Sequence, residues 1–414
     1  RWIPDAALAA WQLDGRLTGT SRFEYSGGKT HGVIEAEIED FQAAGAEGRP
    51  FRDPRVLLVG RGSYDLATNA IVLDGLKLAS QAVVVDGRGG VNLSGDTAVM
   101  QFSGRMDYDM RELSALLAPY VGAGVELVGR QSSPLAFAGP FDLQHARGNA
   151  ALAWQQGNVH GFPVGPSELK MQLQHGVLAA DPLMVAVGSG RMRLEPKLHL
   201  APGPMILALE PGSQLSQVQI TPAMCASGLM YIAPILAGVT SAQGAFSIEL
   251  DRCRLPLDNP VEVDLAGRLV IHSVEVGPGP LIRELAILLD REAPARLRRE
   301  SVVPFRVADG RVHHRDLELI FPDITIRTEG SVGLDQSLAI VASLPVPPKW
   351  LTNNTLRAAF EGQEIRIPVA GTLSSPKLNR AELDAWNRRL LENAAQNVIR
   401  NQVDRGLDRL FGPR

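Results

Sequence analysis

The sequence is poor in the residues from which sites for nucleic acids and sugars are usually built. Only 5% of its 414 residues are aromatic, and the formal net charge is −4. Base-stacking surfaces and sugar clefts rely on aromatic rings, and nucleic-acid binding needs a basic field. The composition disfavours both classes, so we expect no nucleic-acid partner.

Long apolar runs are also absent. No run reaches the ~18 residues of a membrane-spanning helix, and the longest, 228–239, is interrupted by Pro234. The chain begins at Arg1, without Met and without a signal-peptide pattern. We therefore expect a soluble portion of a longer or processed protein, with any membrane anchor in a missing N-terminal part.

Catalytic motifs are missing from the sequence. It contains no H-E-x-x-H, G-x-S-x-G, G-x-x-x-x-G-K or C-x-x-C pattern. His313 and His314 are adjacent, but neighbouring side chains of a strand point to opposite faces and cannot hold one metal together. We expect a non-enzymatic protein with no metal and no cofactor.

Cysteine is nearly absent, with Cys225 and Cys253 as its two instances. In an oxidising envelope these residues could pair, and such a loop would add roughly 3 kcal/mol of stability. The alternative is two buried free thiols. The sequence leaves both possibilities open.

Glycine and proline are plentiful, with 41 and 28 residues spread through the chain, which is typical of turns between many short strands. In Pro304–Leu344, apolar and polar residues alternate in short runs. The runs are separated by Asp309-Gly310, Pro322-Asp323 and Glu329-Gly330. This pattern predicts half-buried antiparallel strands with one apolar face.

Two earlier segments, Arg55–Leu93 and Ser167–Leu200, follow a similar order of strands and glycine turns. Asp86-Gly87 and Gly188–Gly190 occupy the place of Glu329-Gly330, and His175-Gly176 that of Asp309-Gly310. Three loose copies predict a sheet extended by repetition, in which no copy buries its own apolar face. In the first copy the predicted strands are 56–59, 70–73, 76–79, 82–86 and 89–93.

Four helices are predicted from apolar residues at helical spacing. Three of them, at 107–120, 221–237 and 278–290, are short, and we expect them to cap the sheet. The fourth, 379–411, is long and amphipathic. It could pack on its own protein, dock an envelope partner or lie on a membrane surface. Its apolar and basic positions are Trp386, Leu390, Val398, Leu407, Phe411, Arg388, Arg389, Arg400, Arg405 and Arg409.

The order of motifs between Gly267 and Leu378 resembles the C-terminal region of AsmA-like proteins. The similarity rests on the Asp309-Gly310 turn, the segment Glu329–Asp335 (EGSVGLD), the strand ending in Leu-Pro-Val-Pro, and Ile367–Leu378 (IPVAGTLSSPKL). The resemblance implies a periplasmic envelope protein of a Gram-negative bacterium. Proteins of this family are bridge-like lipid carriers, whose long curved sheets have a hydrophobic groove, and they serve outer-membrane homeostasis.

The predicted fold is mainly β, an elongated and curved antiparallel sheet with a few short capping helices and a C-terminal amphipathic helix. Residues 1–145 and 146–220 are expected to hold the first and second repeats. Residues 221–376 form the AsmA-like β region, and 377–414 the helix.

The predicted function is to bind or conduct the acyl chains of a phospholipid or another lipid along an apolar groove. Acyl chains would complete the burial of the apolar face at about 0.8 kcal/mol per CH₂. The alternatives are an envelope scaffold whose two sheets pack face to face without a ligand, and a subunit of a larger assembly. The groove candidates are Phe305, Val307, Leu317, Leu319, Phe321, Ile324, Ile326, Val332, Leu334, Leu338 and Ile340.

Overall fold

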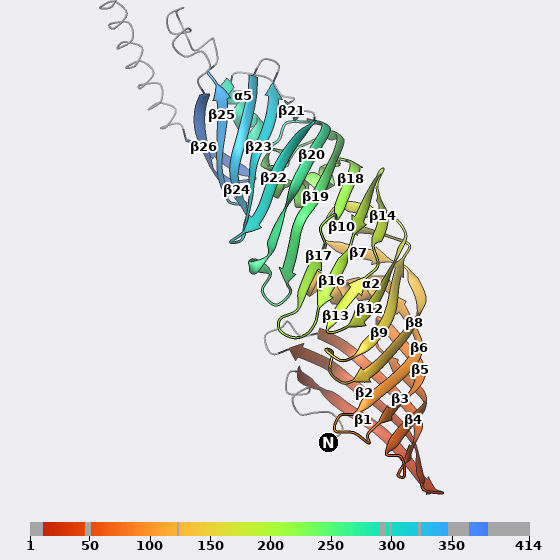
Figure 1. Ribbon diagram of the computed structural model, residues 1–414. Helices are drawn as coiled ribbons and strands as arrows, with labels where there is room; N and C mark the ends of the chain where they lie inside the picture. Colours follow the sequence, from red (N-terminus) through yellow and green to blue (C-terminus); the bar gives the residue numbers. More distant parts are fainter. Residues whose placement is uncertain are drawn as a thin grey trace, which may run out of the picture. The chain divides into compact units, whose positions relative to one another are not determined.

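The computed structural model describes residues 11–45, 51–121, 124–289, 295–297, 300–321, 324–346 and 364–379. Strands account for 68% of the structure and helices for 10%. The 27 strands belong to one antiparallel sheet, whose strands are drawn in Figure 1. The prediction of a mainly-β antiparallel fold is confirmed. The chain divides into unit 1 (Arg1–Val218 and Glu249–Leu265) and unit 2 (Gln219–Ile248 and Ala266–Arg414).

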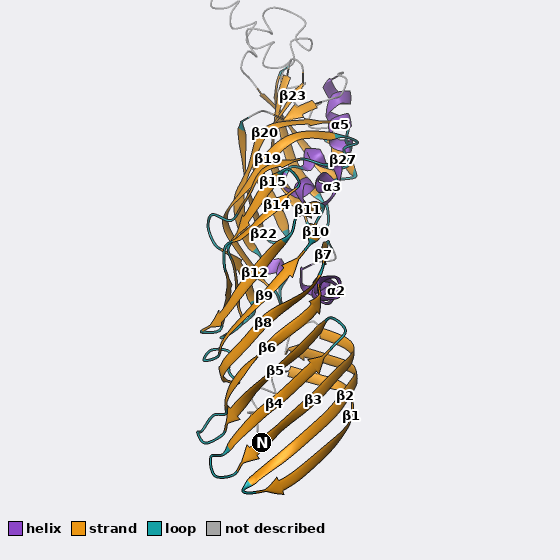
Figure 2. Cartoon of the chain, turned by 90° about the vertical axis from the view of Figure 1, so that its right-hand side faces the viewer, coloured by secondary structure: helices purple, strands orange, loops and turns teal. Residues whose placement is uncertain are grey.

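Unit 1 opens with six long strands that lie side by side and bow along their length (Figure 2). Each strand pairs antiparallel with the next. In the first hairpin Gly27 and Gly28 have φ of 57° and 80°, a conformation that favours glycine. The elements are β1 (Trp11–Ser26), β2 (Lys29–Gly45), β3 (Phe51–Asp65), β4 (Ala70–Ala79), β5 (Val83–Asn92), β6 (Val99–Asp109) and α2 (Met110–Val121).

The following strands of unit 1 are shorter because proline interrupts them. Pro166 and Pro182 lie between strands, and Pro196 begins one, since proline has no N–H for a ladder. The result is two separate series of antiparallel ladders, β8–β9–β12–β13–β16–β17 and β7–β10–β11–β14–β15–β18. The bounds are β7 (Val125–Val128), β8 (Arg130–Pro140), β9 (Arg147–Trp154), β10 (Gln156–Val159), β11 (Phe162–Val164), β12 (Ser167–Gln174), β13 (Val177–Ala180), β14 (Leu183–Val187), β15 (Gly190–Leu194), β16 (Pro196–His199), β17 (Ile206–Leu209) and β18 (Gln214–Gln219).

Two of the predicted glycine turns are wrong. Asp86-Gly87 lies inside β5, and Glu329-Gly330 lies inside β24 (Ile324–Gly333), so the strands continue through both. At Gly330 a Cβ would lie 2.3 Å from the carbonyl oxygen of Ala339 on the next strand. Glycine here allows two backbones to approach closely. The turns at Asp309-Gly310 and His175-Gly176 are confirmed, with positive φ at all four residues.

The predicted repeats therefore have longer strands than expected. Segments 70–73 and 76–79 form the single strand β4, which has a bulge between Leu73 and Leu76. The two segments at 82–93 form β5. In the middle copy, β13 pairs with β16, and the hairpin β14–β15 intervenes in sequence. Consecutive pairing thus holds for the first and third copies only.

Unit 2 contains most of the helices. Thr221 caps the first one, because its hydroxyl accepts a hydrogen bond from the N–H of Met224 at 3.3 Å. The expected helix 221–237 is nevertheless broken into short segments, and Pro234 begins the last of them. The segments are α3 (Pro222–Met224), the π-helix η1 (Cys225–Leu229), α4 (Met230–Ile232) and the 3₁₀ helix η2 (Pro234–Leu236).

The strands of unit 2 form a meander in which each strand from β22 to β27 pairs with the next. The strand β19 begins in this unit and ends in unit 1. The elements are β19 (Ala242–Pro256), β20 (Asp264–Val276), α5 (Pro280–Leu289), β21 (Ala295–Leu297), β22 (Ser301–Ala308), β23 (Arg311–Phe321), β24, β25 (Leu338–Pro345), β26 (Glu364–Thr372) and β27 (Ser375–Leu378).

The apolar face of the β22–β27 meander is covered by the helices of the same unit (Figure 2). The helix α4 contacts β23 and β24, and α5 contacts β27 and η2. Leu229, Leu236 and Leu285 on these helices are at most 1% exposed. A bulge after His314 lets that residue and Leu317 both point into the core. Unit 2 thus has a closed core between sheet and helices.

The closed core predicts that two leucines of unit 2 differ in their contribution to the free energy of unfolding. Leu319 is fully buried, whereas Leu334 is 50% exposed. Truncation of a buried leucine removes packing and leaves a cavity, so we expect Leu319→Ala to lower the free energy of unfolding by about 2–5 kcal/mol. The control Leu334→Ala should cost no more than about 0.5 kcal/mol. Urea denaturation measures both, and equal small losses would contradict a closed core.

Candidate functional site

The structure places most of the predicted groove residues inside the closed core of unit 2. Val307 is half-buried and Leu334 is exposed. Because the chain's own helices cover this face, a ligand has no access to the buried positions. The expectation of an open groove at Pro304–Leu344 is therefore corrected. The nine positions that are at most 6% exposed are Phe305, Leu317, Leu319, Phe321, Ile324, Ile326, Val332, Leu338 and Ile340.

An open apolar face lies instead in unit 1. In an antiparallel ladder, directly opposed residues point to the same face. Following the register from β1 through β6 and then β8, β9, β12, β13, β16 and β17 therefore identifies one face of twelve successive strands. We call this face the apolar face.

The apolar face carries no charged side chain at the opposed positions of Leu17–Tyr25 in β1, Thr30–Ile38 in β2, Val56–Tyr64 in β3 and the nine following strands. Its smaller members are mostly glycine, alanine and serine. Its large members are Leu17, Phe23, Tyr25, Ile34, Ile38, Val56, Leu58, Tyr64, Ile71, Leu73, Leu76, Leu78, Val83, Val85, Val91, Met100, Phe102, Met106, Tyr108, Leu135, Phe137, Leu152, Trp154, Leu169, Met171, Leu173, Leu178, Leu198, Leu207 and Leu209.

Much of the apolar face is accessible to solvent. Leu17 and Tyr25 are each 68% exposed, Ile34 is 43% and Leu78 is 39%. The helices described in unit 1 are α2, which packs on β6 and β7, and the single turn η3 (Pro260–Glu262). The described part of unit 1 therefore has no helical layer comparable to that of unit 2.

The polar atoms of three aromatic side chains on the apolar face have hydrogen-bond partners within the protein. The hydroxyl of Tyr108 accepts a hydrogen bond from the N–H of Ala153 at 2.6 Å, and the indole N–H of Trp154 donates to the carbonyl of Gly165 at 2.9 Å. The hydroxyl of Tyr64 donates to Asn69 Oδ1 at 2.8 Å. The rings can thus present carbon to a ligand without leaving a donor unpaired.

Glycines on neighbouring strands oppose each other on part of the apolar face. Gly87 and Gly104 oppose each other between Leu76 and Leu135. A Cβ on Gly104 would lie 2.3 Å from the carbonyl oxygen of Asp86, so no side chain fits without moving the backbone. The ring of Phe102 lies over Gly87, since a Cβ on Gly87 would be 2.6 Å from its Cζ, so the glycines make room for an aromatic ring of the same face.

The opposite face of the same strands is charged and ion-paired. Arg55 contacts Glu37 at 2.5 Å, and Arg16 contacts Glu39 at 3.2 Å. Arg130 contacts Asp109 at 2.8 Å, and its guanidinium holds the pKa of that carboxyl below its usual value. Such pairs contribute little stability in water, but they keep this face hydrated.

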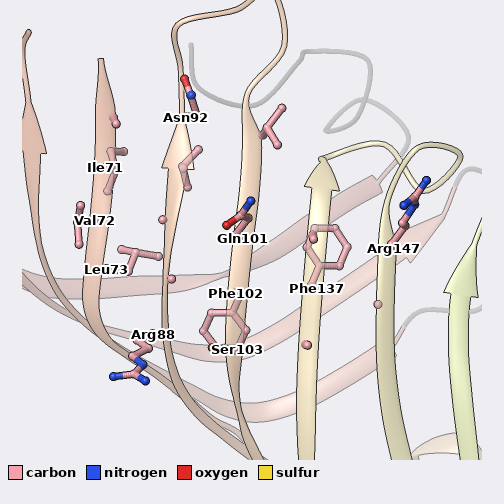
Figure 3. Close-up of a pocket in the computed structure, with 18 of the residues that line it drawn as sticks. Ile71, Val72, Leu73, Arg88, Asn92, Gln101, Phe102, Ser103, Phe137 and Arg147 are labelled. Atoms are coloured by element: carbon pink, nitrogen blue, oxygen red, sulfur yellow. The ribbon is translucent and has the colours of Figure 1, made fainter. Parts of the chain in front are cut away.

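A hollow of 1720 Å³ crosses β4, β5, β6, β8, β9 and β12 (Figure 3). Its lining comes in short runs that begin and end on residues of the charged face, such as Ala136–Ala138, Arg147–Asn149 and Gln172–Gln174. The hollow is nevertheless lined from both faces, since Ile71, Leu73, Val91, Phe102, Phe137 and Leu173 of the apolar face also belong to its lining. Figure 3 shows Arg88 and Arg147 on either side of it. Its amide and guanidinium groups do not suit an acyl chain.

The predictions on histidine and cysteine can be compared with the structure. No group of metal-ligating side chains occurs among the described residues. Cys225 and Cys253 are both buried and free, and burial raises the pKa of the Cys225 thiol to about 12. Of the two alternatives for the cysteines, the structure has the free thiols.

The predicted C-terminal helix, with its apolar and basic positions between Trp386 and Phe411, lies outside the described residues. Its role stays a prediction. In the described part of the chain, no helix has the length and hydrophobicity needed to cross a bilayer.

The sequence predicts an unburied apolar face in the two copies of unit 1 but identifies no groove residue there, for a physical reason. The strands of that face interleave glycine and serine with apolar residues, as in Leu17–Tyr25 (LTGTSRFEY), which weakens the alternation. A glycine opposite a large side chain on the next strand is the signal that could have revealed it, as Gly32 is opposite Phe23. That signal requires the register.

Comparison with protein-family models, curated proteins and solved structures finds no match for this chain.

His314 gives the closed core of unit 2 a dependence on pH. Its Nε2 lies 3.3 Å from Thr328 Oγ1, and its Nδ1 has no hydrogen-bond partner among the described residues. Burial lowers the pKa of His314 from 6.5 to about 4, with a smaller contribution from His313. The unfolded chain thus binds a proton at a higher pH than the folded chain.

The lowered pKa predicts that the stabilisation by neutral His314 is complete above pH 6.5 and is lost as the pH falls towards 4. Between pH 7 and 5 we expect a loss of about 2 kcal/mol from this group. His314→Gln should flatten the dependence of the unfolding free energy on pH over this range. The matched control is His313→Gln at the half-buried neighbour, which should keep the slope. An unchanged slope in His314→Gln would contradict the assignment.

Proposed function

We propose that this protein binds the acyl chains of lipids on the apolar face of unit 1 and acts as a non-enzymatic lipid carrier. The observation that carries the proposal is an accessible face across twelve strands. From Leu17–Tyr25 of β1 to β17, this face has no charged side chain at its opposed positions. Water is a poor solvent for such a face, and monomeric soluble proteins rarely expose contiguous apolar patches of this extent.

The dimensions of the apolar face suit lipid tails. At about 4.8 Å per strand, twelve strands extend the face roughly 50 Å along the curved sheet. One leaflet of a bilayer has a hydrocarbon depth of about 15 Å, half of the ~30 Å core. Several acyl chains can therefore lie along the face in succession. Each buried CH₂ contributes about 0.8 kcal/mol, so ten of them contribute roughly 8 kcal/mol.

The charged face limits how the lipid lies. Head groups that remain hydrated beyond the rim of the apolar face lose no solvation, whereas head groups on the face would be desolvated. We therefore expect selectivity for the acyl part and little selectivity for the head group. The same arrangement fits the AsmA-like resemblance, with a periplasmic location and lipid movement between membranes as parts of the proposal.

The second candidate, an envelope scaffold with a dry core, draws on unit 2, whose apolar face its own helices cover. It does not account for the exposed apolar side chains of β1, β2 and β4. In our proposal unit 2 is the structural part, and unit 1 is the part that binds lipid.

Adjacent residues of β4 provide a matched test. Leu73 lies on the apolar face, and Val72, which is 49% exposed, lies on the charged face. A carboxylate among acyl chains is costly, so we expect Leu73→Asp to lower the amount of co-purifying phospholipid several-fold. Val72→Asp should leave it unchanged. Native mass spectrometry of protein purified without detergent measures the bound lipid.

Circular dichroism of the same samples separates loss of binding from loss of folding. Absence of lipid from the wild-type protein would overturn the proposal, as would equal lipid content in Leu73→Asp and Val72→Asp. Ile34 lies on the same face at a more exposed position. If Leu73→Asp unfolds and Ile34→Asp does not, the lipid content of Ile34→Asp provides the test instead.

A further inference from the structure

On the strands β6, β8 and β9, the two ends of the apolar face differ. The end near α2 is closed, because Tyr108, Ser133 and Trp154 are 4%, 5% and 7% exposed. A hydrogen bond fixes this end, since the hydroxyl of Tyr108 on β6 reaches the N–H of Ala153 on β9 at 2.6 Å. We call Tyr108, Ser133 and Trp154 the end wall.

The opposite end of the same strands, where the loops lie, is open. The loop between β8 and β9 exposes Phe141 by 39% and Leu143 by 41%. The N–H of Gly176, in the next loop along the sheet, donates to the carbonyl of Leu143 at 3.0 Å and holds the two loops together. Phe137 and Leu173 of the apolar face line the hollow at this end. The face is therefore accessible from the loops and closed at the end wall.

Polar groups that suit a phosphate lie at the open end. Arg147 begins β9 and is opposed by Gln174, which ends β12. Both residues line the hollow, and Figure 3 shows Phe137 on the strand next to that of Arg147. Among the described residues, Arg147 has neither an ion pair nor a hydrogen bond. A guanidinium and an amide both donate hydrogen bonds to phosphate oxygens, so this end combines donors with apolar surface.

The charges around the hollow leave Arg147 available for an anion. The lining contains one other cation, Arg88 on β5, and one acid, Asp74 on β4. Asp74 is four strands from Arg147 in the ladder, roughly 19 Å at the spacing of a sheet. Asp142, in the loop that precedes Arg147, is paired with His145 at 2.5 Å.

We propose that a phospholipid lies parallel to β9, with its phosphate at Arg147 and Gln174 and the end of an acyl chain at the end wall. The inference rests on the proposed function and adds the orientation of the lipid and the residues at its two ends. A phosphodiester is common to phospholipids, so the rest of the head group can stay in water beyond the loops. Little selectivity for the head group is therefore still expected.

The distance from the open end to the end wall suits one acyl chain. From Gly148 to Trp154 the face extends over six residues, roughly 20 Å. The hydrocarbon of one bilayer leaflet is about 15 Å deep. An acyl chain of ordinary length that starts at Gly148 therefore ends close to the end wall. At the corresponding end of β1, Leu17 is 68% exposed, so the face is open there.

Quenching of Trp154 fluorescence tests the orientation. Bromine quenches an indole only on close contact. Phospholipids brominated near the end of the acyl chain should therefore quench Trp154, and phospholipids brominated next to the carboxyl group should not. Subtracting the signal of Trp154→Phe isolates this residue from the other tryptophans. Adding Leu173→Trp to Trp154→Phe places an indole at the open end, where the opposite pattern is expected.

Titration of the same signal tests the phosphate end. In Arg147→Gln, the concentration of chain-end-brominated phospholipid needed for half-maximal quenching should rise at least tenfold. A brominated diacylglycerol with the same chains has no phosphate, so its titration should change less than twofold. The control Arg61→Gln removes a guanidinium of the charged face on β3, outside the hollow, and should change neither titration.

The orientation is overturned if bromine next to the carboxyl group quenches Trp154 as strongly as bromine at the chain end. The position of the phosphate is overturned if Arg147→Gln weakens the binding of both lipids equally, or of neither. In these outcomes lipid still binds, so the proposed function stands. Absence of both co-purifying lipid and quenching overturns the proposed function as well. If Trp154→Phe unfolds, Leu173→Trp in the wild-type chain provides the test, because bromine next to the carboxyl group must quench the added signal.

Discussion

The sheet of this protein has an apolar face in each unit, and water solvates such a face poorly. The two units differ in how this face is covered. A single sheet cannot cover itself, because only one layer is present. Unit 2 meets the constraint with its own helices, so that Leu317, Leu319 and Ile326 are completely buried. Unit 1 leaves Leu17, Phe23 and Ile34 exposed by 43–68%. The same constraint is thus met in two ways, with a closed core in unit 2 and an accessible apolar face in unit 1.

Glycines at which neighbouring strands approach closely shape the apolar face of unit 1. Large side chains alternate with glycines across the ladder, as Phe23 does with Gly32 and Phe102 with Gly89. At Gly89 a Cβ would lie 2.1 Å from the carbonyl oxygen of Gln101. Glycine at these positions lets the strands approach closely, and the rings of Phe23 and Phe102 lie over Gly32 and Gly87. The bulge at Asp74-Gly75 keeps Leu73 and Leu76 on the same face on either side of it.

Charge on the opposite face keeps such a sheet in solution. Pairs such as Arg55 with Glu37 lie on strands whose other side is apolar. In unit 2, His314 lies on the buried face of its strand. It shares the apolar face of unit 2 with Val332 and Ile340, and its low pKa follows from that burial. A shift of the strand pairing by one residue would exchange the two faces, so the register is strongly specified.

The sequence by itself determined the strand-rich class, the hairpin turns at Ser26–Thr30, His175-Gly176 and Asp309-Gly310, and the cap at Thr221. These features are local, since they depend on alternation and on residues that favour positive φ or capping. Only the tertiary structure decided which apolar face is open. Leu319 and Leu73 have the same hydrophobicity and similar neighbours in sequence, but helices distant in the chain cover Leu319. Glycines inside strands were read as turns, because a close approach between strands depends on register, which no local pattern records.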